Sequence, residues 1–203
     1  MRWAHRGFFA VSINYRLLGG PSCRGYDFDA IEASGTDAKA AIRFVQAQAQ
    51  AWNIDPTKVF LMGCSAGART SLWSSFVDGN GIGGSSSQAN PEQSAAVAAT
   101  VVVSAELYHP HTASSIVHFD NPVMVPHGAN DDNTSTPFST GADVYQRAVS
   151  ANQPAELHKI LGGYHCPYDQ VGSVCSFVSM KALYLPGEPC LPQVVPFRAL
   201  LFP

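Results

Sequence analysis

Apolar and polar residues along this chain follow two alternating patterns. Short runs rich in β-branched and aromatic residues predict buried strands, and they occur at residues 7–15, 58–63, 95–104, 121–128 and 155–161. Stretches with apolar residues at helical spacing lie between them, at residues 35–52, 65–76 and 141–153. Strands that alternate with helices predict right-handed crossovers, and hence an α/β fold with a mostly parallel sheet and helices on both faces.

Turn and cap residues mark the ends of these elements. Thr36 or Asp37 is the expected N-cap of the helix at residues 35–52. Residues 78–94 are rich in Gly and Ser and predict a surface loop. A further helix is expected over part of residues 173–185, and the Pro-rich end of the chain is expected to be irregular. The 203 residues fit a single domain.

Composition and charge exclude several classes of partner. The chain is 46% hydrophobic and 13% charged, which is typical of a globular protein. Its net charge is −3 and it has no basic run, so nothing favours binding to nucleic acid or to an anionic membrane. No apolar stretch approaches the length of a membrane span. The N-terminal residues lack the segments of a signal peptide, and none is predicted.

The strongest chemical motif follows the second predicted strand. In sheets of this kind, chemistry lies at the carboxyl ends of the strands, and here the residues are Gly63-Cys64-Ser65-Ala66-Gly67. The glycines permit a tight strand-to-helix turn that holds the serine above the sheet. The N–H of Ala66, at a helix N-terminus, can then point at a developing oxyanion. The alternative is a buried turn serine without a catalytic role.

A base and a carboxylate follow two later strands. A serine is a poor nucleophile unless a base takes its proton and a carboxylate orients that base. Asp131 and Asp132 stand just beyond the fourth predicted strand, and His165 stands beyond the fifth. The order Ser, Asp, His is the order of α/β-hydrolases. The alternatives are an Asx-turn aspartate and a surface-loop histidine.

A family resemblance accompanies these residues. Four segments resemble successive blocks of α/β-hydrolase carboxylesterases, with the acetyl-xylan and feruloyl esterase-like members nearest: GFFAVSINYRL, DAKAAIRFVQAQAQAWNIDPTKVFLMGCSAGA, NPVMVPHGANDD and ELHKILGGYH. The resemblance covers most of Gly7–His165. It implies one α/β-hydrolase domain over residues 1–203 that hydrolyses a small-molecule ester and needs no cofactor or metal.

The resemblance also implies a role for each candidate residue. Ser65 is the expected nucleophile, His165 the base and Asp131 the residue that orients it. The aspartate of the family usually stands four residues after the histidine of an HG pair, here His127, and this selects Asp131 over Asp132. We expect His127 to support the loop that carries Asp131.

The cysteines suggest a covalent link beside the site. Cys64 precedes Ser65 and Cys166 follows His165, so a contact between serine and histidine would bring the two cysteines within bridging distance. This resembles tannase-type and fungal feruloyl esterases, in which a disulfide joins the residues beside serine and histidine. We therefore expect a Cys64–Cys166 disulfide, and with it an oxidising compartment, secreted or periplasmic.

Other assignments of the cysteines and histidines stay open. Cys175 and Cys190 would also be able to pair in such a compartment. A thiol nucleophile at Cys64 is the rival to Ser65, although its side chain is expected to point away from substrate. A metal-binding alternative rests on the residues His109, His111, His118 and Asp120, whose spacing fits no compact motif.

The chain departs from the family pattern at its start. The family usually carries an HGG-type loop, the second half of the oxyanion hole, before the segment that begins here at Gly7, yet only six residues precede Gly7. We therefore expect the first strands and that loop to be missing. An unpaired first strand would expose an apolar edge and favour self-association. The alternatives to a serine esterase are a prolyl-oligopeptidase-like peptidase and an inactive fragment without the oxyanion loop.

Overall fold

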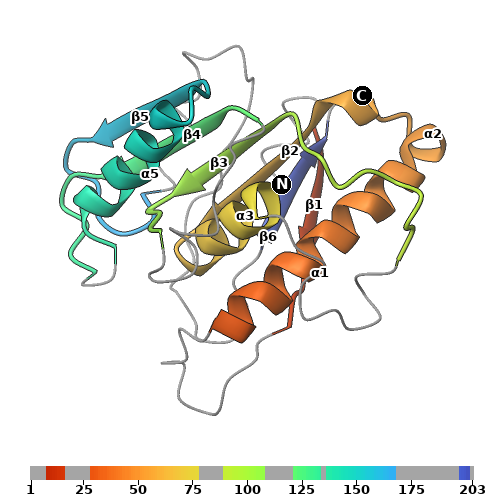
Figure 1. The fold of residues 1–203 in the computed structure, drawn as a ribbon, viewed down its shortest axis with the longest axis horizontal. Helices are drawn as coiled ribbons and strands as arrows, with labels where there is room; N and C mark the ends of the chain where they lie inside the picture. The colour runs from red at the N-terminus through yellow and green to blue at the C-terminus, as the bar shows by residue number, and fades with distance from the viewer. Residues whose placement is uncertain are drawn as a thin grey trace.

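The described strands of this chain form one sheet whose order is β1-β6-β2-β3-β4-β5 (Figure 1). The computed structural model describes residues 8–16, 28–77, 89–107, 121–133, 136–167 and 197–201. The strands are β1 (Phe9–Ile13), β2 (Val59–Cys64), β3 (Ala99–Val103), β4 (Val123–Gly128), β5 (Ala155–Ile160) and β6 (Phe197–Leu201). The helices are α1 (Phe28–Ala47), α2 (Ala49–Trp52), the short 3₁₀ turn η2 (Pro56–Lys58), α3 (Ala66–Phe76) and α5 (Phe138–Ser150).

The four strands from β2 to β5 run parallel, as the alternating pattern predicts. All five predicted strands are present, and β1 and β3 are each about half as long as their predicted ranges. Their register aligns the end of β2 with the end of β3, where Cys64 pairs with Val103. Because parallel strands end at one edge of a sheet, the residues that follow β2, β3, β4 and β5 lie along that same edge.

The antiparallel strand β6 corrects the prediction of an irregular C-terminal end. It lies between β1 and β2 and pairs with both, Phe9 with Leu201 and Phe60 with Leu200. The five apolar-rich residues are too few for periodicity to distinguish a strand from other structure. β1 also differs from its predicted buried state. It is the outermost strand at its end of the described sheet, and Phe9 is 39% exposed.

The start of α1 corrects a second prediction. The helix begins at Phe28, so Thr36 is buried inside it and Asp37 is bound to Arg16 instead of capping it. Gly35, the first residue of the predicted helix range, lies where α1 meets α3. A Cβ at this position would be 2.1 Å from Cε3 of Trp73. Gly35 therefore allows the two helices to approach closely.

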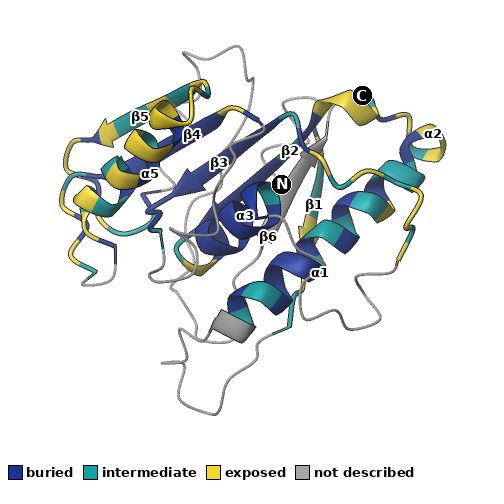
Figure 2. Ribbon diagram, viewed as in Figure 1, coloured by how far each residue is buried: buried dark blue, intermediate teal, exposed yellow. Residues whose placement is uncertain are grey.

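The three longer described helices all pack on one face of the sheet, whereas the sequence predicted helices on both faces (Figure 1). Figure 2 shows the central strands buried and the outer surfaces of α2 and α5 exposed. One apolar core joins α1, α3 and α5 to the central strands, with Ile31, Leu72, Trp73, Val102, Val125 and Val144 among its members. A second joins α1 to β2, with Ile42, Val45, Val59 and Leu61 among its members.

Some predictions fall outside the described residues. These are the helix within residues 173–185 and most of the loop at residues 78–94. Of the helices in the described ranges, none combines the length and the apolar character that a membrane span requires.

Candidate active site

The turn after β2 holds Ser65 in a strained backbone conformation. Its φ is 53° and its ψ is −118°, which a residue with a side chain adopts at a cost of about 1–3 kcal/mol. The turn is tight, because a Cβ at Gly63 would lie 2.0 Å from the carbonyl oxygen of Gly67. The Ser65 N–H donates to the carbonyl of Val103 at 3.0 Å. Strain held in place by surrounding contacts is typical of functional sites.

The helix α3 begins directly after this serine. Its first residue, Ala66, carries an N–H that has no acceptor within the helix, so it is available at the positive end of the helix dipole. The first turn is anchored to α1 by a hydrogen bond between the hydroxyls of Ser34 and Thr70 at 2.8 Å. Ser65 is half-buried and Ala66 is exposed, so the turn is open to solvent.

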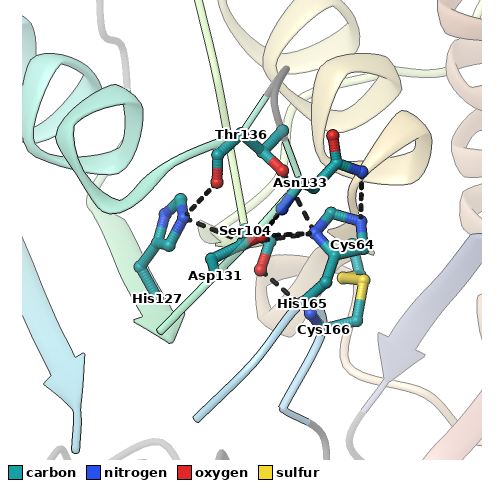
Figure 3. Close-up of a disulfide and its surroundings, with 8 residues drawn as sticks. All are labelled: Cys64, Ser104, His127, Asp131, Asn133, Thr136, His165 and Cys166. Carbon is teal, nitrogen blue, oxygen red and sulfur yellow. Dashed lines mark hydrogen bonds and ion pairs between the residues drawn. A yellow bond between two sulfur atoms is a disulfide. The ribbon is translucent and has the colours of Figure 1, made fainter. Parts of the chain in front are cut away.

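Asp131 and His165 are in direct contact at the ends of β4 and β5 (Figure 3). The Nδ1 atom of His165 lies 3.0 Å from each carboxylate oxygen of Asp131. We assign the proton to Nδ1, because a carboxylate can only accept, and this leaves Nε2 as the basic nitrogen. The Asp131 side chain is fully buried, while the alternative residue Asp132 is exposed.

Two further groups hold the Asp131 carboxylate. The Asn133 backbone N–H donates to Oδ1 at 3.1 Å, and His127 Nε2 lies 3.2 Å from Oδ2. The same His127 nitrogen lies 2.9 Å from the carbonyl oxygen of Thr136, so it carries the proton. Burial lowers the pKa of His127, whose side chain is fully enclosed, and keeps the ring neutral. The role expected for His127 is thus visible as a direct contact.

A disulfide joins the serine turn to the histidine loop. It links Cys64 to Cys166 with a Cα–Cα distance of 6.0 Å, which is the pair expected from the resemblance. The buried Ser104, at the end of β3, accepts a hydrogen bond from the Cys166 N–H at 3.0 Å. The residues flanking the bridge, Ser65 and His165, are therefore held on neighbouring segments of one sheet edge.

Within the described contacts, Ser65 makes no side-chain hydrogen bond with His165. The Nε2 atom of His165 instead lies 3.5 Å from the side-chain amide nitrogen of Asn133. Catalytic hydrogen bonds are often long or poorly aligned without substrate and tighten when it binds. The structure thus brings Asp131 and His165 into contact, and the disulfide holds Ser65 beside them.

A buried ion pair lies one helical turn from the serine. Arg69 in α3 bonds to Glu106, which follows β3, and both residues are buried. Burial raises the pKa of Glu106, and the Arg69 guanidinium opposes that shift. The pair ties the first turns of α3 to the end of β3. No pattern in the sequence indicates this pair, and none indicates Ser104, Asn133 or Thr136.

The metal and second-disulfide alternatives fall on other parts of the chain. The histidines of the metal alternative, together with Cys175 and Cys190, lie outside the described residues. In the ranges that are described, no group of three or more His, Cys, Asp or Glu side chains is placed to hold a metal ion.

Comparisons with known proteins give one family match and several similar folds. The BD-FAE family matches residues 1–111. A search of curated protein sequences finds no match. The native esterase Est2 of the planctomycete Thermogutta terrifontis is 19% identical, with a TM-score of 0.61 over 78% of this chain and 68% of that chain.

Two other solved structures are similar to the same extent. A truncated carbohydrate esterase from gut microbiota is 20% identical, with a TM-score of 0.55 over 76% of this chain and 66% of that one. The Thermogutta terrifontis esterase 2 phosphorylated by paraoxon is 17% identical, with a TM-score of 0.58 over 77% of this chain and 66% of that one. This chain thus spans about two thirds of the length of these proteins, and the likeness shows a shared fold.

Proposed function

This chain belongs to the BD-FAE family of α/β-hydrolase esterases, and from that membership we propose that it cleaves carboxylic esters through a triad of Ser65, His165 and Asp131. The predicted α/β-hydrolase fold and the predicted class, carboxylic-ester hydrolase, are confirmed at the level of the family. The proposal of the triad is carried by one observation, the contact of a buried carboxylate with the Nδ1 of an imidazole whose loop is bridged to the serine turn.

The proposed reaction has two halves. In the first, His165 Nε2 takes the proton of the Ser65 hydroxyl as its oxygen attacks the ester carbonyl. The tetrahedral oxyanion is held by the Ala66 N–H, and its collapse breaks the bond to the alcohol oxygen, which takes the proton from Nε2. In the second, Nε2 takes a proton from water, whose oxygen attacks the acyl-enzyme, and Ser65 is released with its proton restored.

The carboxylate of Asp131 controls the protonation state of His165 during both halves of the reaction. It fixes the tautomer with the proton on Nδ1, so that Nε2 faces the reacting atoms as a base. It also stabilises the imidazolium that forms at each proton transfer. The hydrogen bond from the Asn133 backbone and the close contact with His127 hold the carboxylate in the orientation that the imidazole requires.

The substrate class and compartment are also proposals. Small acyl or aryl esters are the expected substrates, with feruloyl esters, acetylated xylan and polyesters as the candidates that the family resemblance suggests. One structural neighbour is described as a carbohydrate esterase, which supports an ester on a sugar. A disulfide at the site supports a secreted or periplasmic location, because such bonds persist in oxidising compartments.

The test is labelling of the folded chain with a fluorophosphonate probe, together with hydrolysis of 4-nitrophenyl acetate. We expect one labelled site at Ser65, and loss of both labelling and hydrolysis in Ser65→Ala. Ser139→Ala is the matched control, because Ser139 is an exposed serine at the start of α5. Folded protein that is neither labelled nor active would support the inactive-fragment alternative, and faster cleavage of aminoacyl anilides than of esters would support the peptidase alternative.

A further inference from the structure

The basic nitrogen of His165 lies beside the amide of Asn133, a residue that the triad does not include. Asn133 Nδ2 is 3.5 Å from His165 Nε2, and Figure 3 shows the amide directed at the imidazole edge. Since Nδ1 is committed to Asp131, Nε2 is the atom at which every proton transfer of the proposed mechanism takes place. Asn133 therefore borders the position of the reacting oxygens.

Asn133 is held in this place by the catalytic carboxylate itself. Its backbone N–H donates to Asp131 Oδ1 two residues earlier in the chain, which is an Asx-turn. The Thr136 hydroxyl oxygen lies 3.1 Å from Nδ1 of His165. Asn133 and Thr136 thus lie beside the two nitrogens of the imidazole, Asn133 at Nε2 and Thr136 at Nδ1. A residue whose backbone is held by the group that orients the base keeps its place beside that base.

The distance allows one oxygen to contact both groups. An oxygen bound to Nε2 at about 2.8 Å can also lie about 2.9 Å from Nδ2, because the two nitrogens are 3.5 Å apart. In the first half of the reaction, that oxygen belongs to the departing alcohol. In the second half, it belongs to the attacking water.

We propose, on the basis of the function proposed above, that Asn133 is a further catalytic residue that donates a hydrogen bond to the oxygen of the departing alcohol. As the tetrahedral intermediate collapses, the C–O bond breaks and its electron pair moves to that oxygen, which takes the proton from Nε2. The carbonyl re-forms on the acyl group attached to Ser65, and Asn133 keeps its own protons. A donor there stabilises the negative charge that develops on the leaving oxygen, whereas the same donor does not make a water more nucleophilic.

The effect should depend on the alcohol. When ethanol leaves, negative charge develops on its oxygen, and a hydrogen-bond donor stabilises that charge. When 4-nitrophenol leaves, the charge spreads into the nitrophenyl ring, so the donor contributes little. We expect Asn133→Ala to lower kcat/KM for ethyl acetate by about 10- to 100-fold, the usual range for a hydrogen bond to a charged group. For 4-nitrophenyl acetate, the loss should stay below about threefold. Both esters give the same acetyl-enzyme, so kcat/KM isolates the first half of the reaction.

Two variants sharpen the experiment. Asn133→Asp replaces the donor with an acceptor at nearly equal size, and it should lose at least as much activity on ethyl acetate as Asn133→Ala. Asn130→Ala is the matched control, since Asn130 is exposed in the same loop and is held through its backbone N–H to Gly163. It should leave both esters unaffected.

Equal losses on the two esters would overturn the inference, because a distorted Asx-turn lowers activity without regard to the alcohol. No loss on ethyl acetate would overturn it as well. In both cases an active wild-type enzyme labelled at Ser65 would leave the proposed function standing. A folded wild-type protein that cleaves neither ester and is not labelled would overturn the proposed function, and this inference with it.

Discussion

Removal of the Cys64–Cys166 disulfide is the perturbation whose size follows most directly from the structure. The bridge joins residues 102 positions apart in the sequence, and it lies beside the two residues proposed to exchange a proton. The variant that removes it without adding bulk is Cys64→Ser combined with Cys166→Ser. Its effect on stability and its effect on activity can be measured separately.

The chain-entropy model gives the magnitude. Closing a loop of 102 residues reduces the entropy of the unfolded chain by an amount worth about 4.7 kcal/mol at 25 °C. Single domains of ordinary size have unfolding free energies of about 5–15 kcal/mol. The bridge therefore accounts for about a third or more of the expected stability. With a urea slope of about 2 kcal/mol/M, its loss lowers the unfolding midpoint by about 2 M.

The assay is urea unfolding at equilibrium, followed by circular dichroism, of the wild type and the double variant. The chain has five cysteines, so the double variant with and without reductant serves as the control for the other three. The reductant should lower the midpoint of the wild type and leave that of the double variant nearly unchanged. Hydrolysis of 4-nitrophenyl acetate below the midpoint shows whether the bridge also positions His165 relative to Ser65.

A double variant whose midpoint differs from the wild type by less than about 0.3 M, at an equal slope, would refute this reasoning. Such a result would mean that the unfolded chain is already restrained over this loop, so that the bridge removes little entropy. A changed slope would instead show that the compactness of the unfolded state differs between the two proteins.

Two further predictions concern the core and the site. Gly35→Ala should lower the unfolding free energy by about 1–3 kcal/mol, because the new Cβ would lie 2.1 Å from Trp73. Alanine normally favours a helix over glycine, so a raised urea midpoint would contradict this packing. Because burial lowers the pKa of His127 in the folded state, the unfolded chain takes up the proton first as the pH falls below about 6.5. The contribution of the neutral His127 to the free energy of unfolding should therefore be fully present above that pH. It should decrease as the pH drops toward the pKa of His127 in the folded state. Urea midpoints at about pH 7.5 and 5.5 should show a smaller decrease in His127→Gln than in the wild type, and equal decreases would contradict a buried neutral ring.

The parts of the site that the sequence predicts are those that follow strand ends. Ser65 directly follows β2, and Asp131 and His165 come a few residues after the ends of β4 and β5, each strand being indicated by the length and composition of its run. Parallel strands place such residues along one edge, so their nearness needs no knowledge of long-range contacts. The choice between Asp131 and Asp132 rests on the family pattern; in the structure Asp131 is buried and contacts His165, whereas Asp132 is exposed.

The groups that the sequence does not reveal act through contacts between distant segments. Ser104 has no special neighbours in the sequence, and its importance lies in the Cys166 N–H more than 60 positions away. The role of Gly35 is likewise not visible in the sequence, because its packing against Trp73 is a tertiary contact. β6 is not predictable from its own five residues, because it forms a strand only by pairing with β1 and β2, which lie far earlier in the sequence.

The position of β6 has a consequence for how the chain folds. The strands β1 and β2 each pair with β6, whose residues 197–201 are far from β1 in the sequence. During synthesis, β1 and the side of β2 that faces β6 cannot form these hydrogen bonds until residues 197–201 have left the ribosome. Sheets whose pairing joins distant positions in the sequence fold slowly, and their folding intermediates are prone to aggregation. This end of the sheet should therefore be the last to form, and it is the point at which chaperones would act.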